Sequence, residues 1–488
     1  MYYKHFEMED LRFIDTERGK KKLIFLGHMY TLLRKNKDKT IETWRCVERE
    51  RCNSTMQIDA EHRRVVTQPR NHSHASSWSA CHAAELMRDI ASEATNNTHE
   101  KPAQIIQRKL QHVESAVALH LPQRDTLRKV VRKKQRGDLP PEPATLDELE
   151  ELPEQIRELD GAAWFRYDTG PGLADRLVLF ASGEGLRTLK QSNYWIGDGT
   201  FKVVPRVFHQ LYTLHASIQG KFFPCMYGLL TKKTEAAYEA FFRQVREAVN
   251  EQCDEFPNPT HFSSDYELAA INAVRHVFPD ITLSGCLFHF AQIMWRRVQD
   301  AGLQQAYNQE GEEQLRVEVH SLTALAFLPV DDVAGAFDSL AERIDERLLP
   351  VADHLEDYFI RGRAARRGRR RAPHYPIPTW NCYDRVLAGL PRTTNSVEGW
   401  HNRLNSIICR AHISLYVFLR QLQAEERQVI LDRELLLNGR SPPRKKKKYA
   451  QLNERMERVV LTYNEYKDND DIATYLRRVG HLLSGSLQ

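Results

Sequence analysis

The sequence predicts an α/β protein in which a small β-rich domain and a basic helical region precede a larger domain of mixed strands and helices. Three observations support this fold class. Short strand-like segments fill residues 11–74, the apolar period becomes helical between residues 83 and 136, and strands and helices alternate from residue 191. With 488 residues, the chain is too long to fold around a single hydrophobic core. Because 41% of its residues are hydrophobic, it is also too apolar to be wholly disordered.

The first two predicted regions differ in the spacing of their apolar residues, which is typical of strands in the first and of helices in the second. The β-rich segments KKLIFLG, HMYTLLRK and TIETWRCVE are separated by Gly27 and by a polar turn at residues 35–39. Further on, AQIIQRKLQHV and QRDTLRKVVRKKQR place apolar residues at helical spacing with basic residues between them. The Pro-rich, acidic segment at residues 138–153 is typical of a linker.

From residue 191 onward the sequence predicts a mixed sheet. NYWIGDGTFKVV, QLYTLHASIQ and FFPCMYGLLT are three consecutive strands, followed by the amphipathic helix TEAAYEAFFRQVREAVNE with Thr234 as its N-cap. Two further strands, PTHFSSD and ITLSGC, each lead into a helix. The order β-β-β-α-β-α-β-α is the layout of a ribonuclease-H-like sheet with helices on its faces.

The predicted organisation has five parts, without an internal repeat. They are a β-rich domain over 1–75, a basic helical region over 76–137, an acidic linker and lead-in over 138–190, a ribonuclease-H-like domain over 191–430 with a helical insertion at about 300–395, and a basic helical tail over 431–488.

Charge is segregated along the chain although the net charge is only +5. Basic stretches at 99–136, 361–371 and 444–448 alternate with an acidic one at 138–160, which predicts local contacts with a polyanion. No segment approaches the roughly 18–20 apolar residues of a membrane helix, and the N-terminus lacks a signal-peptide pattern. We therefore expect no membrane association and a place in the cytosol or nucleus, with PPRKKKKY at 442–449 favouring the nucleus.

Two cysteines and two histidines form the series Cys-x5-Cys-x19-His-x-His within the first domain. They are Cys46, Cys52, His72 and His74. Two thiolates and two imidazoles suit tetrahedral zinc, and a domain this small gains stability from a metal. The spacing is equally satisfied by two core cysteines near surface histidines, and three rival ligands remain open, namely His62, Cys81 and His82.

The same segment resembles a FLYWCH-type zinc finger. The likeness covers roughly the first 75 residues and rests on Gly19, Leu23, Gly27, Tyr30, Trp44-Arg45-Cys46, Cys52 and His72-Ser73-His74. It implies a structural Zn²⁺ bound by Cys46, Cys52, His72 and His74, and a surface that binds DNA or protein.

Three acidic residues occupy positions that suit phosphodiester chemistry. Asp198 ends the first predicted strand of the large domain, Asp265 ends the fourth, and Glu398 lies on the later helix TNSVEGWHNRLN. Because the first and fourth strands run side by side, the two aspartates would meet at their ends. Converging carboxylates hold two Mg²⁺ or Mn²⁺ ions. The alternative is three unrelated acids among 65, and Glu425 and Glu426 on the next helix are rivals of Glu398.

Residues 191–430 resemble the catalytic domain of Mutator-like element (MULE) transposases. The likeness rests on DGTFKVVP, FPCMYGLLTKKTEAAYEAFF, FSSDYELAAINAV, GCLFHFAQ and NSVEGWHNRLN. It implies Asp198, Asp265 and Glu398 as the magnesium-binding catalytic residues. Cys286 and His289 match the family's Cys-x2-His pair, for which we expect a supporting role at the active site, such as orienting DNA. A buried cysteine and a hydrogen-bonded core histidine are the alternative.

Basic helices and aromatic residues extend the expected contacts with DNA. The region before residue 137 predicts either a helix-turn-helix-like arm or a solvated helical hairpin, with DNA contacts from Arg128, Lys129, Arg132, Lys133 and Lys134. RGRAARRGRRR at 361–371 is expected to touch the DNA backbone or to form a disordered loop. Trp195, Trp380 and Trp400 either stack on unpaired bases or belong to the core, which we favour for Trp195.

These features together predict a DNA transposase. It would bind the terminal repeats of its element as a dimer or larger assembly, cleave double-stranded DNA with Mg²⁺, and join the freed ends to target DNA. The alternative is a domesticated, transposase-derived DNA-binding protein that acts in transcription or chromatin without catalysis. In a third interpretation the FLYWCH module binds protein.

Overall fold

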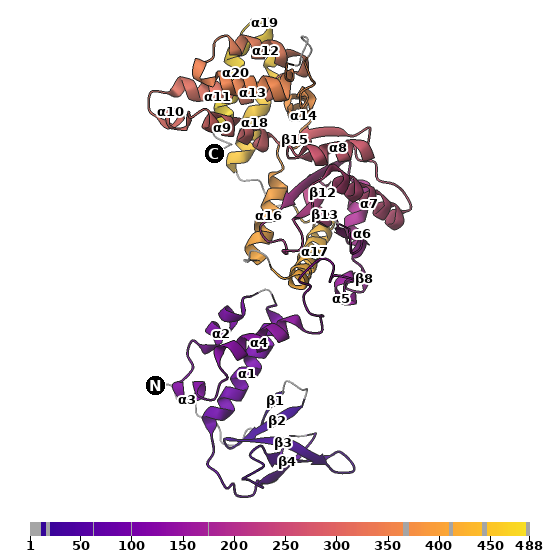
Figure 1. Cartoon of the computed structure of the whole chain (residues 1–488), viewed down its shortest axis with the longest axis vertical. Coiled ribbons are helices and arrows are strands. Elements are labelled where there is room, and N and C mark those ends of the chain that lie inside the picture. The colour runs from indigo at the N-terminus through magenta and orange to yellow at the C-terminus, as the bar shows by residue number, and fades with distance from the viewer. Residues whose placement is uncertain are drawn as a thin grey trace. The chain divides into compact units, whose positions relative to one another are not determined.

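The computed structural model of the chain describes residues 11–15, 20–61, 63–98, 100–173, 175–364, 370–408, 413–441 and 447–484. The chain divides into two compact units, unit 1 (Met1–Pro140) and unit 2 (Pro141–Gln488). Figure 1 shows that the first sheet and helices α1–α4 belong to unit 1 and that the remaining elements belong to unit 2.

Unit 1 begins with an antiparallel sheet in which each strand pairs with the next along the chain. Leu26 and Gly27 join its second and third strands with φ values of 49° and 73°, a conformation typical of two-residue hairpins. Leu23, Tyr30 and Trp44 are buried on its inner face. The strands are β1 (Arg12–Asp15), β2 (Lys21–Phe25), β3 (His28–Lys35), β4 (Ile41–Cys46), β5 (Thr55–Asp59) and β6 (Val65–Thr67).

Four helices complete the described part of unit 1. Ser77 caps the first one by accepting a hydrogen bond from the backbone N–H of Ala80. Ile90, Leu127 and Val131 share an apolar core, which leaves the basic residues between them outside. The helices are α1 (Trp78–Asn96), α2 (Pro102–Leu110), α3 (Ser115–Ala118) and α4 (Arg124–Arg136).

The main sheet of unit 2 combines antiparallel and parallel strands in the order β15-β14-β11-β12-β13-β10-β9. β11, β12 and β13 pair antiparallel with one another in that order, and β14 and β15 are added in parallel beside β11. Between residues 191 and 299, the strands and helices follow one another in the predicted order. The strands are β11 (Tyr194–Thr200), β12 (Gln210–Ile218), β13 (Lys221–Leu230), β14 (His261–Ser264) and β15 (Thr282–Gly285).

Residues within the predicted lead-in also belong to this sheet. β10 (Leu177–Phe180) pairs with β13, and β9 (Phe165–Asp168) pairs with β10. Before them, α5 (Glu154–Arg157) leads into a small hairpin of β7 (Glu158–Leu159) and β8 (Ala162–Ala163). The sequence prediction did not include β9 and β10, because the strand that β10 joins lies much later in the chain.

Helices cover both faces of the main sheet. On one face, Trp195 packs into the core formed with α6 (Gly183–Gln191), α7 (Glu235–Cys253) and α8 (Leu268–Val277). On the other face, Tyr194 and Ile196 pack against Val397 of α16 (Asn395–Ile408). Because side chains alternate along a strand, Asp198 shares the α16 face with Tyr194 and Ile196. α17 (Leu415–Leu437) contacts β13 beside α16.

The predicted helical insertion and the predicted C-terminal tail form one apolar core. Val460, Tyr463 and Tyr475 of the tail are buried together with Phe290 and Trp380. The tail therefore packs as part of unit 2. The helices are α9 (Leu287–Asp300), α10 (Gln304–Asn308), α11 (Glu313–Ala324), α12 (Val333–Ala341), α13 (Leu349–Leu355), α14 (Ile377–Trp380), α15 (Tyr383–Leu387), α18 (Lys447–Leu461), α19 (Tyr463–Asp468) and α20 (Ile472–Ser484), with short turns η1 (Leu325–Phe327), η2 (Val330–Asp332), η3 (Glu346–Leu348) and η4 (Glu356–Ile360).

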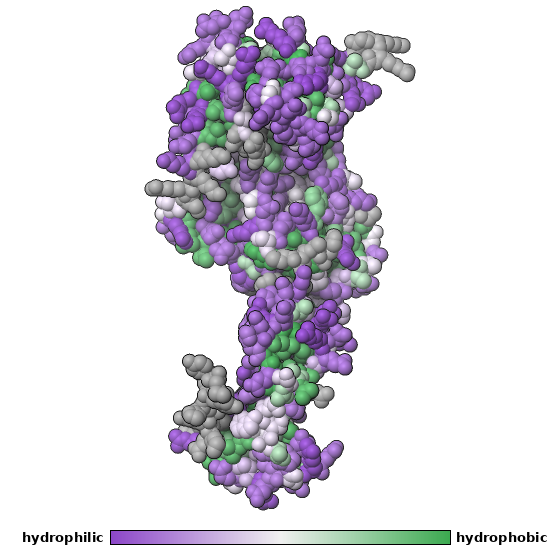
Figure 2. Space-filling view, turned by 90° about the vertical axis from the view of Figure 1, so that its left-hand side faces the viewer, coloured by the Kyte–Doolittle hydropathy of each residue, from purple (hydrophilic) through white to green (hydrophobic). Residues whose placement is uncertain are grey.

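Hydrophilic residues dominate the face of the molecule shown in Figure 2, and apolar side chains reach this surface in separate areas. Within the described ranges, no helix has both the length and the apolar content that a membrane crossing requires.

Candidate metal centres and nucleic-acid interface

The four predicted zinc ligands lie together at one end of the unit 1 sheet. Cys46 ends β4, and Cys52 lies in the turn that leads into β5. His72 and His74 follow β6 and return the chain to this turn. One ligand atom from each of the four side chains lies within 4.8 Å of the others. The structure thus brings together residues that lie far apart in the sequence.

The distances between these atoms fit a tetrahedral zinc site. Cys46 Sγ lies 3.3 Å from His74 Nε2, and Cys52 Sγ lies 3.3 Å from His72 Nδ1. The two histidine nitrogens are also 3.3 Å apart. A zinc ion with bonds of about 2.3 Å to sulfur and about 2.0 Å to nitrogen holds its ligand atoms about 3.3–3.8 Å apart. The donor set and its spacing therefore match zinc.

Hydrogen bonds orient both imidazoles toward the cysteines. Nε2 of His72 lies 2.8 Å from the Tyr30 hydroxyl, and Nδ1 of His74 lies 3.0 Å from the carbonyl oxygen of Ala75. His28 stacks on His72 with ring centroids 3.6 Å apart. Such contacts to the second ring nitrogen fix the orientation of a metal-binding histidine.

The pKa shifts of Cys52 and His72 favour metal binding, whereas burial raises the pKa of Cys46. Burial would raise the pKa of Cys52, but hydrogen bonds from the backbones of Ser54 and Ser73 outweigh it and lower the pKa to about 7. Burial, followed by the charges of His28 and His74, lowers the pKa of His72 to about 4. A thiolate and a neutral imidazole are the forms that bind metal.

Of the three alternative zinc ligands, the two that the structure describes, Cys81 and His82, do not belong to this cluster. Cys81 lies in an apolar cluster with Ile14 and Ile24, and burial raises its pKa to about 11. His82 is not among the four clustered residues. His62 and Gly19 lie outside the described residues.

The second predicted site lies at the carboxyl ends of neighbouring parallel strands in unit 2. Ile196 of β11 pairs with Ser263 of β14. Continuing this register by two residues places Asp198 beside Asp265 at the same edge of the sheet. Asp198 is 7% exposed. The positions predicted for the two aspartates at strand ends are therefore those that the fold brings together.

The third parallel strand brings the Cys-x2-His pair to the same edge. Ser264 pairs with Gly285 of β15, so Cys286 follows beside Asp265. Cys286 is buried at the start of α9, and its Sγ accepts a hydrogen bond from the Thr394 backbone N–H at 3.3 Å. His289, in the first turn of α9, therefore faces the edge that carries both aspartates.

α16 contributes two side chains to this region. Glu398 Oε1 lies 3.6 Å from His289 Nε2. His401, one helical turn after Glu398, places Nδ1 3.3 Å from Asp198 Oδ2. Cys286, His289 and Glu398 form a second group whose ligand atoms all lie within 4.8 Å of one another. The three carboxylates do not form such a group among the described residues.

A neighbouring threonine holds His401 in place. Thr213 of β12 pairs with Asp198 across the sheet. Its hydroxyl donates to the Asp198 carbonyl at 3.3 Å and lies 2.9 Å from His401 Nε2. Sequence reasoning did not single out His401 or Thr213. The spacing of Glu398 and His401 on one helix face was the available signal, but their partner on another strand was not visible.

Electrostatic interactions link the acidic side chains. Burial, followed by the negative charges of Asp198 and Glu267, raises the pKa of Asp265 to about 6. Burial likewise raises the pKa of Glu398, and the charge of Asp198 acts in the same direction. Burying like charges near one another is costly unless a cation balances them.

Cys286 and His289 form a hydrogen-bonded pair beside these acids. Burial would raise the pKa of Cys286, but its hydrogen bond and charge interaction with His289 outweigh this effect and lower the pKa. Burial would lower the pKa of His289, but Cys286 and then the charges of Asp265 and Glu398 raise it to about 9. Nδ1 of His289 and Oε1 of Glu398 are buried without a hydrogen bond to another described residue.

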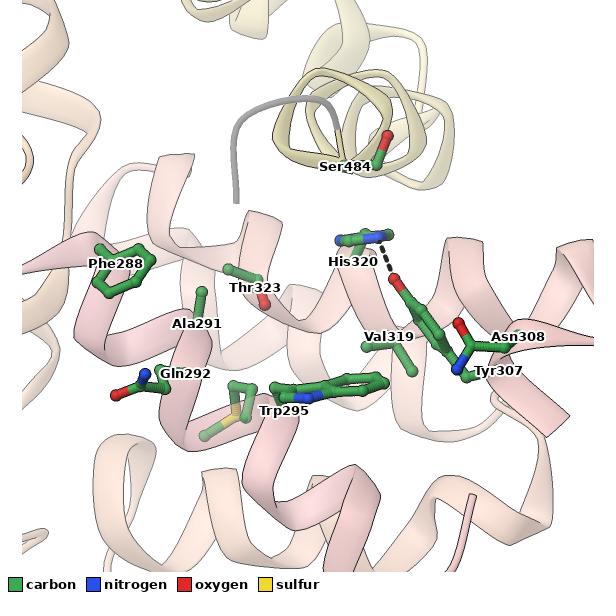
Figure 3. A pocket seen from close by; sticks show the side chains of 11 residues that line it. Phe288, Ala291, Gln292, Trp295, Tyr307, Asn308, Val319, His320, Thr323 and Ser484 are labelled. Carbon is green, nitrogen blue, oxygen red and sulfur yellow. Dashed lines mark hydrogen bonds between the residues drawn. The ribbon is translucent and has the colours of Figure 1, made fainter. Parts of the chain in front are cut away.

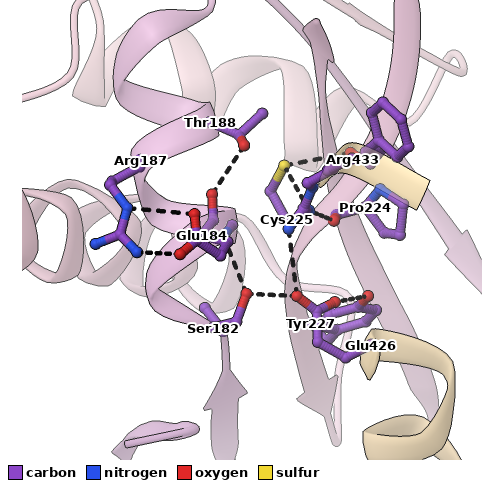
Figure 4. Close-up of polar contacts among 12 residues, drawn as sticks. Ser182, Glu184, Arg187, Thr188, Pro224, Cys225, Tyr227, Glu426 and Arg433 are labelled. Atoms are coloured by element: carbon purple, nitrogen blue, oxygen red, sulfur yellow. Dashed lines mark hydrogen bonds and ion pairs between the residues drawn. The ribbon is translucent and has the colours of Figure 1, made fainter. Parts of the chain in front are cut away.

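The rival acids on α17 are occupied elsewhere (Figure 4). Glu426 is fully buried and accepts hydrogen bonds from the hydroxyls of Ser182 and Tyr227. It also lies 3.4 Å from Arg433. Glu425 pairs with Arg403 at 2.7 Å. This network joins α17 to β13 and α6 and leaves Glu398 as the acid that faces the strand ends.

The tryptophans do not offer a ring face for base stacking. Trp195 and Trp380 are fully buried, and Trp400 is 8% exposed. Trp195 is in the core, as we favoured. Trp380 stacks on Phe290 within the helical core. The alternative of stacking on unpaired bases is wrong for these residues, because their rings already contact other side chains.

The basic face of α4 is open to solvent. Arg128, Lys129, Arg132 and Lys133 are exposed, and Lys134 is half-buried. Arg128 pairs with Asp125 at 2.8 Å. The other four make no ion pair with a residue that the structure describes. These cations therefore form a positive surface on unit 1.

The later basic runs are only partly described. Residues 365–369 and 442–446 lie outside the described ranges. Arg361 pairs with Asp338 at 2.6 Å, and Arg370 pairs with Glu356 at 2.6 Å. These two arginines therefore form ion pairs with acidic residues of unit 2 itself.

Comparison with known families identifies two domains in this chain. The model of the FLYWCH zinc finger domain matches residues 13–74, and that of the MULE transposase domain matches residues 194–293. A search of curated proteins found no match. The chain thus contains a FLYWCH zinc finger and a MULE transposase domain, as the sequence predicted, and is a transposase-related protein. The FLYWCH match and the four-residue cluster together support a structural zinc ion.

The MULE match covers part of the predicted site. Asp198, Asp265, Cys286 and His289 lie within it, whereas Glu398 lies beyond its end at residue 293. The match is therefore shorter than the resemblance predicted over 191–430.

Proposed function

We propose that this protein is a DNA transposase that binds element ends through unit 1 and cleaves and joins DNA at Asp198, Asp265 and Glu398. The observation that carries this proposal is that α16 brings Glu398 to the face and edge of the sheet where the two aspartates end. The strand order of the sheet, antiparallel on one side of β11 and parallel on the other, supports a ribonuclease-H-like arrangement.

The donor chemistry of this edge fits hard divalent cations. Asp198, Asp265 and Glu398 would hold the ions through carboxylate oxygens, which Mg²⁺ and Mn²⁺ prefer. When bound, the ions supply Lewis acidity that activates an attacking water or 3′-hydroxyl and stabilises the leaving oxygen. Two such ions lie about 3.5–4 Å apart. Carboxylates that bind them therefore need not be in contact with one another. The raised pKa of Asp265 is consistent with crowded charges that a cation would balance.

The neighbouring histidines have separate tasks in this proposal. His401, held by Thr213, orients the Asp198 carboxylate. His289 contacts the phosphate being cleaved, because its Nε2 lies 3.6 Å from Glu398 Oε1 at the strand-end edge that carries both aspartates. Cys286 positions His289. Full cleavage activity in a Cys286→Ala/His289→Ala variant would remove this role.

Unit 1 supplies affinity for DNA. Its zinc finger and the positive surface of α4 would bind the terminal repeats of the element through phosphate contacts. Since two ends must be cut together, we expect at least two copies of the protein on DNA. We expect the protein to act in the nucleus, in line with the basic run PPRKKKKY at 442–449.

The decisive experiment uses purified full-length protein, DNA from the flanks of its own gene, and Mg²⁺. We expect strand cleavage that the Glu398→Gln variant lowers by at least a thousandfold, because removing a metal ligand removes several kcal/mol of transition-state stabilisation. Glu425→Gln is the matched control, since Glu425 pairs with Arg403, and it should cleave normally. Equal cleavage by both variants would refute the assignment of Glu398.

One observation favours a second candidate, a DNA-binding regulator descended from a transposase. The zinc cluster and the basic face of α4 belong to unit 1, whereas the acids belong to unit 2. DNA binding therefore does not require the acidic site. Tight DNA binding by wild-type protein without any cleavage in Mg²⁺ or Mn²⁺ would favour this candidate.

A further inference from the structure

A cavity of about 350 Å³ lies in the helical part of unit 2 (Figure 3). α9 forms one wall, α10 and α11 form another, and Ser484 at the end of α20 lies across from them. The volume falls within the range of small-molecule sites in proteins. None of the residues with a predicted role lines this cavity.

Aromatic rings form much of its wall. Trp295 and Tyr307 meet at 65° with their centroids 4.7 Å apart, which makes a corner. Phe288 lies on the same helix as Trp295, and Figure 3 shows it at the other end of the cavity. The Tyr307 hydroxyl and His320 Nε2 are 2.8 Å apart and fix each other. A flat ring can stack in such a corner.

Polar groups with spare hydrogen-bonding capacity line the same space. Gln292 accepts a hydrogen bond from Arg296, which leaves its amide N–H groups without a described partner. Asn308 donates its amide N–H to the Gln304 carbonyl at 2.9 Å, which leaves its side-chain oxygen to accept. Thr323 adds a hydroxyl. Donors and acceptors at the rim of an aromatic wall match the edge of a heteroaromatic ring.

The cavity begins beside the acidic site. Phe288 precedes His289 directly, and their ring centroids are 5.7 Å apart. With a rise of about 1.5 Å per helical residue, Trp295 lies about 9 Å along α9 from His289. That distance is about two to three times the 3.4 Å spacing of bases in one strand of B-DNA. A strand that runs from the acids along α9 would therefore pass within a few nucleotides of the cavity.

We propose that this cavity receives one unstacked nucleobase of the DNA strand held at the acidic site. The inference rests on the proposed function for the path of that strand. The base would stack on Trp295 and use Gln292 and Asn308 at its edge. Unpairing a base costs energy, which stacking and hydrogen bonds in the cavity offset. Holding one base in this way would fix the position of the neighbouring phosphate.

The test uses full-length protein carrying Glu398→Gln, without added Mg²⁺ or Mn²⁺ and without a chelator, so that binding is measured without cleavage and the zinc finger keeps its metal. Two single-stranded oligonucleotides of equal length are compared, one of thymidine and one with abasic sites, which share the same backbone charge. We expect the thymidine strand to bind more tightly, and Trp295→Ala to reduce that preference by about tenfold, in line with the loss of one stacked base. Phe256→Ala, an exposed aromatic residue elsewhere in unit 2, is the control and should keep the preference.

A second measurement leaves the residues of the cavity unchanged. Photocrosslinking of Glu398→Gln protein with a 5-iodouracil oligonucleotide should yield adducts on Trp295 or Tyr307. An unchanged preference in a folded Trp295→Ala variant, or adducts confined to other regions, would overturn the proposal. The cleavage assay with Glu398→Gln reports on the proposed function separately, so failure of one leaves the other interpretable.

Discussion

The two candidate metal centres of this protein are built in opposite ways. In unit 1 the zinc ligands lie within 4.8 Å of one another on short strands and turns, where the apolar core is small. In unit 2 the carboxylates lie at the edge of a seven-stranded sheet with helices on both faces, and hydrogen bonds such as that between Thr213 and His401 hold the surrounding groups. We therefore expect the first site to depend on metal for its fold and the second to be assembled by protein packing.

The two sites should therefore respond differently to the loss of their metal. A small domain that closes around zinc loses its structure when the metal leaves. A site supported by a large core keeps its shape without metal and loses only its chemistry.

Removal of zinc should unfold the sheet of unit 1 and leave unit 2 intact. Structural zinc contributes on the order of 10 kcal/mol in small domains, which exceeds the stability of most such folds. Hydrogen exchange of the full chain with a zinc chelator should show lost protection in β4 and β5 and unchanged protection in β11–β13. Cys46→Ser should mimic the chelator, whereas Cys81→Ser, outside the cluster, should retain zinc. Persistent protection of β4 after verified zinc loss would show that the sheet of unit 1 does not depend on zinc for its fold.

Breaking the buried network of α17 should destabilise unit 2 by about 3–5 kcal/mol. Glu426→Gln leaves Arg433 buried without its charge partner, and the loss of one partner of a buried pair is costly. Urea unfolding followed by circular dichroism measures the change. Glu425→Gln removes a more exposed pair and should cost less than about 1 kcal/mol. Similar midpoints for both variants would show that the network adds little.

Loss of the histidine that contacts Asp198 should weaken metal use without unfolding the protein. His401→Asn is expected to raise the Mn²⁺ concentration needed for half-maximal cleavage by about 10–100-fold, as for other groups that orient metal ligands. Thr213→Val should act in the same direction, and Thr213→Ser, which keeps the hydroxyl, should restore the normal requirement. A lower melting temperature with an unchanged metal requirement would assign His401 to structure alone.

Removing exposed cations from α4 should weaken DNA binding uniformly across sequences. For Lys129→Ala/Arg132→Ala/Lys133→Ala, the slope of log affinity against log salt should become less steep by up to about 3, near 0.9 for each lost phosphate contact. Arg187→Ala/Arg243→Ala removes two exposed arginines that pair with glutamates in unit 2 and serves as control. An unchanged slope in the α4 variant would place the DNA contact elsewhere.

Much of the candidate site could be predicted from the sequence because its members occupy locally recognisable positions. Asp198 and Asp265 end apolar strands, and the cysteines and histidines of unit 1 follow a spacing that suits zinc. The roles of the acids stay predictions, since the family match includes the two aspartates but not Glu398. Local patterns also separated strands from helices between residues 191 and 299.

Local sequence patterns thus predict the type of each element and the chemistry at its ends, because the spacing of apolar residues and the residue types act over a few neighbouring positions. Which distant elements meet depends on the folding of the whole unit. The contact of His401 with Asp198, the addition of β9 and β10 to the main sheet, and the packing of α18–α20 with the helical insertion are of this kind. Each joins segments far apart in the chain, and such pairings depend on the packing of the whole unit, which no local pattern records.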